Sequence, residues 1–190
     1  MKSLSARPSS GAKNCLGSWT TSAASQSAGE VVVKIAVDNR EQLAYSFQGY
    51  DCTTEAATLN VGDYSVLGFL DKIACERKSL DDLLGCLTAG RERFEKELAR
   101  ARSLDRFCVL VEASFEDLAK GLYRSAMKPH SACQSIIAWQ IRYGTPFVFA
   151  GSRKASEYYC FSFLQKYVHE IEQRMKVLAK AQAPAKGAAA

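Results

Sequence analysis

The 190-residue sequence contains only two histidines, His130 and His169, and their separation leaves neither with a nearby histidine partner. A histidine-based metal or acid–base site is therefore not expected. The seven cysteines include no Cys-x-x-Cys pair, and their odd number and irregular spacing are untypical of a disulfide framework or a zinc site. We interpret them as reduced, mostly buried thiols. No run of about 18 apolar residues occurs, which excludes a membrane-spanning helix.

Neither sign of charge dominates the sequence. It has 25 lysines and arginines against 20 acidic residues, a net charge of +5 and a pI near 8.8. The positive excess lies at the two ends, because residues 31–152 carry 15 basic and 16 acidic residues. Such a balance permits a nucleic-acid partner without establishing one. With 47% hydrophobic residues, the composition is that of a globular protein rather than a wholly disordered chain.

Composition divides the chain into three parts. Residues 1–30 are rich in Ser, Ala, Thr and Gly and are predicted to be a disordered leader, although the same composition fits an organellar transit peptide. Residues 31–178 are predicted to form one folded domain. Residues 179–190, which are rich in alanine, are predicted to be a flexible tail.

Apolar periodicity in the middle part alternates between the patterns of strands and helices. Strands are predicted at 31–37, 53–61, 64–67, 72–78, 106–113 and 147–150. Helices are predicted from Ser79 through Leu98 as one long pattern, and at 115–122, 131–143 and 157–178. The first strands suggest an antiparallel meander, with a turn at Gly62 and Asp63. The alternation predicts an α/β fold, a mixed β-sheet flanked by helices.

Four carboxylates stand at predicted strand ends rather than on helix surfaces. Asp38 ends the first strand and Glu41 follows it, Asp63 lies at the turn, and Glu76 lies in the ACERK strand. Because strand side chains alternate, Glu76 and Lys78 share one face. In a meander, Asp63 on the preceding strand would join them, which places two carboxylates and one ammonium around a single point.

This arrangement suits metal-assisted phosphodiester cleavage. One or two carboxylates can hold a Mg²⁺ ion that keeps several waters, and such an ion can activate water toward a phosphate. A nearby ammonium can stabilise the developing negative charge. The alternative for Glu76 and Lys78 is an ordinary solvated strand face, since a short Asp then Glu-x-Lys pattern also occurs by chance.

The exact residues around these positions are more specific than the generic Asp then Glu-x-Lys pattern. The stretch GDY, followed by ERKSLDDL, resembles the XPF-type structure-specific endonuclease family, whose signature is GD…ERKxxxD. Glu76, Arg77, Lys78 and Asp82 match ERKxxxD without a gap. Further similar segments are VDNRE at 37–41, GRERFEKEL at 90–98 and the stretch 136–153. The resemblance covers about 31–172.

The resemblance implies a restriction-endonuclease-like nuclease core and roles for the motif residues. It implies a metal site for Mg²⁺ or Mn²⁺ made of Asp38, Glu41, Asp63 and Glu76. It further implies that Lys78 is the catalytic lysine and that Arg77 helps to bind or position the scissile phosphate. Strand alternation places Arg77 on the face opposite Glu76, so that role rests on the resemblance alone.

Other basic residues are assigned in the same way. The resemblance makes Arg40, Arg77 and Arg91 candidate DNA contacts, whereas the remaining mixed charges of the helix around Arg91 are interpreted as a solvated face with i,i+4 pairs. Asp82 is interpreted as a supporting residue, a helix cap or an orienter of a basic side chain, because a negative charge is favourable near a helix N-terminus.

The sequence is therefore predicted to encode a metal-dependent DNA endonuclease that acts on branched, flap or fork DNA in repair or recombination. The alternatives are a catalytically silent DNA-binding or dimerisation partner and a sequence-specific restriction-like enzyme.

Many family members carry a tandem helix-hairpin-helix domain, whereas only the short tail follows residue 178 here, so we expect a stand-alone form. In the family this end of the domain forms a dimer interface, which implies a homodimer, or pairing with a related partner, through the C-terminal helices. We expect a cytoplasmic or nucleoid location for a bacterial or phage protein, and an organellar or nuclear one if residues 1–30 are a targeting segment.

Overall fold

A computed structural model describes residues 32–183. Their strands form one mixed sheet in the order β2-β1-β3-β4-β5-β6. The strands are β1 (Val33–Asp38), β2 (Cys52–Ala57), β3 (Tyr64–Val66), β4 (Ile73–Lys78), β5 (Arg106–Val111) and β6 (Phe147–Phe149). β3 is antiparallel to both of its neighbours, β1 and β4, and every other pair in the sheet is parallel. The predicted α/β class with a mixed sheet is confirmed.

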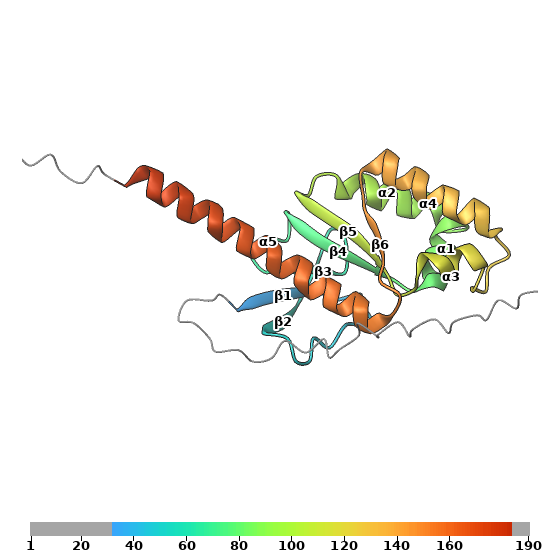
Figure 1. Cartoon of the computed structure of the whole chain (residues 1–190), viewed down its shortest axis with the longest axis horizontal. Coiled ribbons are helices and arrows are strands. Elements are labelled where there is room, and N and C mark those ends of the chain that lie inside the picture. The colour runs from blue at the N-terminus through green and yellow to red at the C-terminus, as the bar shows by residue number, and fades with distance from the viewer. Residues whose placement is uncertain (1–31, 184–190) are drawn as a thin grey trace, which may run out of the picture.

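Helices cover both faces of this sheet (Figure 1). They are α1 (Leu80–Leu87), α2 (Arg91–Ala101), α3 (Phe115–Lys120), α4 (Pro129–Tyr143) and α5 (Arg153–Gln182). The first four pack on one face through a core that includes Phe94 and Trp139. α5 covers the other face through Cys160, Phe161 and Leu164. The result is a three-layer α/β/α domain.

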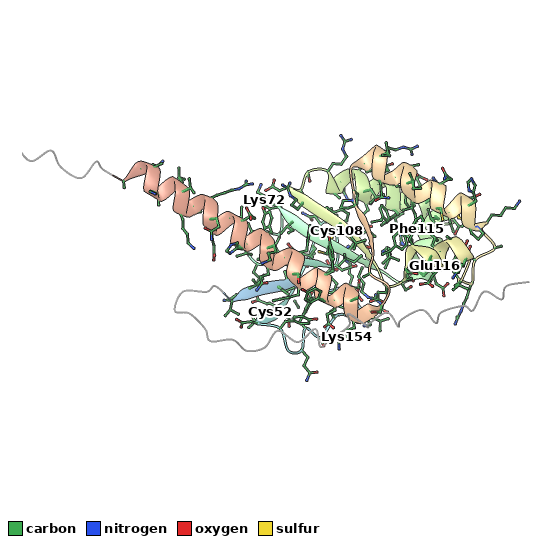
Figure 2. The ribbon with its side chains drawn as sticks, viewed as in Figure 1. Cys52, Lys72, Cys108, Phe115, Glu116 and Lys154 are labelled. Carbon is green, nitrogen blue, oxygen red and sulfur yellow. The ribbon has the colours of Figure 1, made fainter. Side chains whose placement is uncertain are left out.

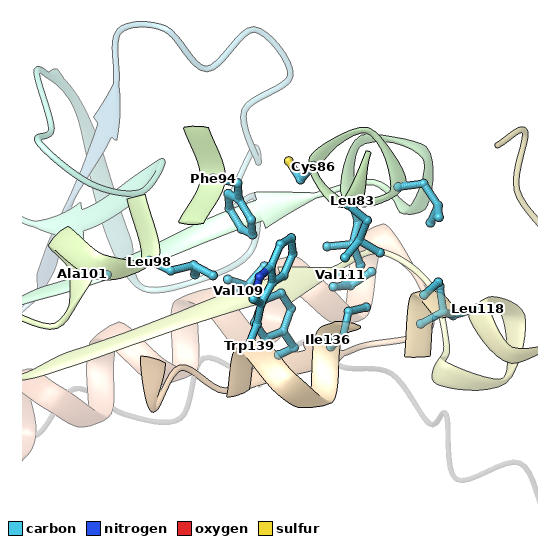
Figure 3. Close-up of a cluster of buried hydrophobic side chains, with 14 of the residues drawn as sticks. Leu83, Cys86, Phe94, Leu98, Ala101, Val109, Val111, Leu118, Ile136 and Trp139 are labelled. Carbon is cyan, nitrogen blue, oxygen red and sulfur yellow. The ribbon is translucent and has the colours of Figure 1, made fainter. Parts of the chain in front are cut away.

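The alternation of side chains in the central strands separates the two cores. In β5, Cys108 and Leu110 belong to the core under α5, whereas Val109 and Val111 belong to the core under α1–α4. Figure 3 shows this second core, where the ring of Trp139 lies beside Val109 and near Phe94. The Phe94 and Trp139 rings meet edge to face, with centroids 5.3 Å apart. The same alternation in β4 decides which side chains of the ERK motif face which helices.

The predicted antiparallel meander is wrong at its first connection. β2 does not pair with β3; it pairs in parallel with β1, which lies between them. The apolar β1 takes the interior position, whereas the side chains of β2 are mostly exposed, as suits a strand at the edge of the sheet. Gly62, with φ of 78°, ends the crossing from β2 to β3 instead of forming a hairpin between them.

Two helix predictions also need correction. The long helical pattern after Ser79 is broken into α1 and α2 at Thr88–Gly90, where the N–H of Gly90 donates to the carbonyl of Gly85 (2.9 Å). The last helix begins at Arg153, and it continues to Gln182, which shortens the predicted tail. Alanine, lysine and glutamine sustain the helix until Ala183, whose position before Pro184 favours its extended ψ of 133°. The predicted leader, residues 1–30, and the tail from 184 lie outside the described residues.

α5 is longer than the sheet that it covers. It crosses one face, and its C-terminal half extends past the sheet (Figure 1). On this extension Met175 is 59% exposed and Leu178 is 47% exposed. Across the described part of the chain, no helix combines the length and apolarity that crossing a bilayer requires.

Candidate active site

The predicted site residues gather at one end of the sheet. In Figure 2 this end is marked by the labels Phe115 and Glu116, which belong to the helix after β5. Lys72, just before β4, marks the opposite end. Because β3 runs antiparallel to β4, Asp63 at the start of β3 lies beside the end of β4. Two backbone hydrogen bonds fix Asp63 there. Its N–H donates to the carbonyl of Cys75 (2.8 Å), and its carbonyl accepts from the N–H of Asp38 (2.8 Å).

Asp63 and Glu76 are two neighbouring carboxyls whose ionised forms are both destabilised. Burial raises the pKa of Asp63 to about 6, against the opposing effects of a hydrogen bond from the backbone N–H of Arg77 (2.8 Å) and the charge of Lys78. Burial, and then the charge of Asp63, raise the pKa of the Glu76 carboxyl well above its usual range. Burial and mutual repulsion both disfavour the ionised forms of these two carboxyls, so a bound cation would be stabilised between them.

Lys78 completes this group on the same face of β4. Its ammonium forms an ion pair with Glu76 Oε1 and lies 5.4 Å from the centroid of the Phe94 ring. Burial alone would lower the pKa of Lys78, but the Glu76 carboxylate outweighs it, and the net shift is upward. Lys78 therefore stays protonated at neutral pH, which suits a donor of positive charge and hydrogen bonds rather than a general base.

Arg77 faces the opposite side of β4, as strand alternation predicts. Its guanidinium binds both oxygens of Glu112, with Nε to Oε1 at 2.8 Å and Nη2 to Oε2 at 3.2 Å. Its Nη1 lies 3.6 Å from Glu41 Oε1, and the side chain is only 8% exposed. The structure thus places the Arg77 guanidinium against two carboxylates, while its predicted contact with the scissile phosphate stays a prediction.

Glu112 is a residue that the sequence reasoning missed. It directly follows β5, and its Oε1 also accepts from Nη1 of Arg153 (2.8 Å). The sequence contained a signal for Glu112, because Glu112, like Asp38, is a charged residue at the end of an apolar strand. Alternation in β5 places Glu112 on the same face as Cys108 and Leu110, toward α5.

Asp38 is held by Arg40 and by the backbone that follows β2. Its Oδ1 accepts from the backbone N–H of Arg40 (2.8 Å) and from Arg40 Nε (2.7 Å), and its Oδ2 accepts from Arg40 Nη2 (2.9 Å) and the N–H of Leu59 (2.8 Å). The side-chain hydrogen bond from Arg40 is the largest cause of the lowered pKa of Asp38. Asp38 therefore anchors Arg40, whose side chain is 72% exposed.

The four carboxylates predicted to bind metal are divided between different partners. Asp63 and Glu76 face each other's charge, while Asp38 is engaged by Arg40, and Glu41 accepts from the N–H of Leu43 (2.6 Å). Within residues 32–183, no three Asp, Glu, His or Cys side chains are arranged to hold one metal ion together. Two hard oxygen donors still fit Mg²⁺, which keeps several of its waters. The donor set that fits is Asp63 with Glu76, and the larger set stays a prediction.

The helices after the motif supply further charges. Arg91 pairs with Glu95 (Nε to Oε1, 3.1 Å), and its guanidinium lies 5.2 Å from the centroid of Trp139. Glu97, interpreted from the sequence as part of a solvated face, instead acts on the site, because its charge helps to raise the pKa of Asp63 and Glu76. Mixed charges on a helix cannot show from the sequence which of them faces a neighbouring strand.

Asp82 lies at the beginning of α1 as a capping residue. Its N–H donates to Ser79 Oγ (3.1 Å), and the Ser79 hydroxyl donates to Asp82 Oδ2 (2.6 Å). These bonds satisfy the helix N-terminus locally, and the negative charge is favourable at this end of the helix. The geometry favours the capping interpretation of Asp82.

The mixed sheet, its helices and the ERK-centred charges define an α/β nuclease core. A family model described as the ERCC4 domain matches residues 37–163. The chain therefore belongs to the ERCC4 domain family, the XPF-type nuclease family that its motif resembles.

Solved structures agree on the fold. XPF from Aeropyrum pernix is similar at a TM-score of 0.57 and 20% identity, over 80% of this chain and 75% of that one. XPF from Aeropyrum pernix in complex with DNA is similar at a TM-score of 0.55 and 20% identity, over 73% of this chain and 66% of that one. No curated protein gives a significant match to the chain.

Proposed function

We propose that this protein is a metal-dependent DNA endonuclease that hydrolyses phosphodiester bonds, with branched, flap or fork DNA as substrate in repair or recombination. The observation that supports it best is the group of Asp63, Glu76 and Lys78 at the end of β4. It combines two carboxyls of raised pKa with an ammonium that stays charged. Membership of the ERCC4 domain family supports the same chemistry.

The residues of this group have separable roles. Asp63 and Glu76 would hold the Mg²⁺ or Mn²⁺ ion, which when bound polarises the phosphate and lowers the pKa of an attacking water. Lys78 keeps its proton and directs positive charge to the position where negative charge develops on the phosphate. Glu76 also orients Lys78 through their ion pair.

DNA is proposed to lie across the same end of the sheet. Arg40 presents an exposed guanidinium there, and Arg91 lies on α2, which follows the motif. Lys154 lies at the beginning of α5 (Figure 2), next to Arg153. The solved complex of the Aeropyrum pernix protein with DNA supports DNA as the partner. Contacts of this kind release counterions, so binding is expected to weaken steeply with salt.

A cleavage assay tests the proposal. The full chain is incubated with labelled flap, fork and linear duplex DNA over a range of Mg²⁺ concentrations, beside Glu76→Gln. The matched control is Asp71→Asn, an exposed acid beside Lys72 at the opposite end of the sheet (Figure 2). We expect Mg²⁺-dependent cutting by the wild type and the control, and none by Glu76→Gln. Cutting without metal, or by Glu76→Gln at the wild-type rate, would contradict the mechanism, and DNA binding without cutting would favour a silent partner.

Self-association through α5 is a further part of the proposal. Apolar residues recur along this helix at alternating spacings of four and three, the pattern of a coiled-coil seam, at Leu164, Val168, Ile171, Met175 and Leu178. The seam begins in the core and continues onto the exposed extension of α5. Sedimentation analysis should show a dimer that Met175→Glu dissociates and that Gln173→Glu, an exposed change outside the seam, does not. A monomeric wild type at micromolar concentration would contradict it.

A further inference from the structure

Glu112 is shared by two arginines from different parts of the chain. Its Oε1 accepts from Arg77 Nε and from Arg153 Nη1, each at 2.8 Å, and its Oε2 accepts from Arg77 Nη2 at 3.2 Å. The Glu112 side chain is only 11% exposed. A carboxylate so nearly removed from water is stable only with partners of this kind, and both partners here are charged.

Glu112 also holds the end of β4 through its backbone. Its N–H donates to the carbonyl of Lys78 (2.9 Å), one residue beyond the arginine that its side chain binds. Arg77 in turn donates its backbone N–H to Asp63 Oδ2 (2.8 Å). A chain of direct contacts therefore runs from Glu112, through Arg77, to one of the two carboxyls that fit a metal ion.

Arg153 supports Glu112 from the other side. Its Nη2 donates to the carbonyls of Leu43 (2.6 Å) and Ala44 (2.9 Å), and its guanidinium lies 4.9 Å from the centroid of the Tyr45 ring. Arg153 is the first residue of α5, where the helix dipole disfavours a cation. Its position is therefore maintained by Glu112 and these carbonyls rather than by the helix.

The charges around Arg77 balance within this network. Arg77 and Arg153 face Glu41 and Glu112, so that the nearly buried guanidinium of Arg77 is neutralised without DNA. Because the Arg77 side chain is only 8% exposed, a phosphate has little access to its remaining N–H groups. The contacts thus assign Arg77 the function of fixing the strand end that carries the site.

We propose that Glu112, supported by Arg153, is a positioning residue for the nuclease reaction proposed above, on which this inference rests. It fixes Arg77 and the end of β4, and thereby keeps the Asp63 carboxyl aligned with Glu76. Outer contacts of this kind change metal affinity or activity by about 10- to 100-fold when they are removed. Glu112 itself touches neither substrate nor metal in this scheme.

The experiment compares Glu112→Gln and Glu112→Ala with wild type in the full chain. Glutamine keeps one oxygen acceptor for an arginine but loses the charge, whereas alanine loses both. We expect kcat to fall about tenfold for Glu112→Gln and further for Glu112→Ala, with KM for flap DNA within about threefold of wild type. The half-maximal Mg²⁺ concentration should rise in the same order. Asp71→Asn, at the opposite end of the sheet, is the matched control and should match wild type in all three.

Each outcome either supports or overturns the inference. Folded variants with wild-type kcat and Mg²⁺ dependence would overturn it while leaving the nuclease proposal intact. The inference would also be overturned if the loss of activity follows the fraction of unfolded protein, measured by circular dichroism, with unchanged kinetics per folded molecule.

If the wild type itself does not cut DNA, the nuclease proposal fails, and Mg²⁺ affinity measured by calorimetry still decides the inference. Weaker Mg²⁺ binding by folded Glu112→Gln supports it, and equal or absent binding overturns it.

Discussion

The backbone N–H of Arg77 donates to Oδ2 of Asp63 at 2.8 Å, whereas the guanidinium of Arg77 lies on the other face of β4 and binds Glu112. One residue thus connects the two sides of the central strand. On one side lie the carboxyl pair and Lys78, and on the other a balanced network of arginines and glutamates. This connection makes the geometry of the candidate site depend on residues that do not line it.

Replacing Lys78 by methionine should abolish most of the cleavage while DNA binding persists. The change removes the charge that would stabilise the transition state, and losses of such donors cost about 10²- to 10³-fold in kcat. Single-turnover cleavage and a binding titration under the same conditions measure the two effects. Lys96→Met, an exposed lysine paired with Glu92, is the control and should cut normally. Equal cleavage by Lys78→Met would show that the ammonium has no catalytic role.

Asp63→Asn should stabilise the protein in the absence of divalent metal at pH 8. The folded pKa of Asp63 is about 6 and its ordinary value is 3.8, so the folded state binds the extra proton between these values. The free energy of unfolding therefore falls as pH rises from about 4 to 6, and the penalty is complete above 6. Asparagine removes it, and thermal melts should show a gain of up to about 3 kcal/mol at pH 8 and almost none at pH 3.

Mg²⁺ binding should offset the loss of stability that the ionised Asp63 causes, and this effect should depend on pH in the same way. Mg²⁺ is expected to raise the melting temperature of wild type above pH 6, where Asp63 is ionised, and to have much less effect at pH 4.5. Asp63→Asn should lose most of this Mg²⁺ effect. A melting temperature that responds to Mg²⁺ equally in wild type and Asp63→Asn would show that the ion binds elsewhere.

Gly62→Ala should destabilise the protein and impair the site, whereas Gly85→Ala should stabilise it. Gly62 has φ of 78°, and a Cβ there would lie 2.9 Å from Ala74 Cβ and 3.0 Å from the carbonyl oxygen of Cys75. The strained backbone would cost about 1–3 kcal/mol and would move the adjacent Asp63. Gly85 lies inside α1 with open space around it, so alanine there should add about 0.5–1 kcal/mol. Chemical denaturation measures both, and a neutral Gly62→Ala would contradict the close approach.

Asp82→Ala should affect stability more than cleavage. The substitution removes the carboxylate that binds Ser79 and complements the N-terminus of α1, which is expected to cost about 0.5–1.5 kcal/mol. The cleavage rate per folded molecule should stay within about threefold of wild type. A loss of cleavage beyond tenfold with an unchanged melting temperature would instead place Asp82 in the catalytic machinery.

Local patterns in the sequence could predict much of the candidate site. Strand alternation correctly separated Arg77 from Glu76 and Lys78, because side-chain direction in a strand depends only on the parity of position. The antiparallel turn after Gly62 also predicted Asp63 beside Glu76, since Asp63 directly precedes β3 and Glu76 lies in its antiparallel neighbour β4. Both results depend on residues close together in the sequence. For the same reason the order of helices and strands was predicted correctly, apart from the break between α1 and α2.

Features that depend on partners distant in the sequence were not predictable in this way. The position of β2 at the outer edge depends on how well β1 and β2 each fit between two other strands, which no local pattern measures. The involvement of Glu112 depends on Arg77, 35 residues earlier, and on Arg153, 41 residues later. The ion pair between Asp38 and Arg40 depends on side-chain rotamers, which a sequence pattern does not specify.

The antiparallel connection of β3 to β4 has a consequence for how the protein folds. Asp63 and Glu76 both belong to this local unit, which closes a short loop and can form early. Glu112 follows β5, and α1 and α2 separate it from Arg77 in the sequence, so their contact closes a longer loop. If this unit forms early, the repulsion between its two carboxyls opposes folding as well as the finished fold. We therefore expect a cation that relieves the repulsion to accelerate folding of the domain.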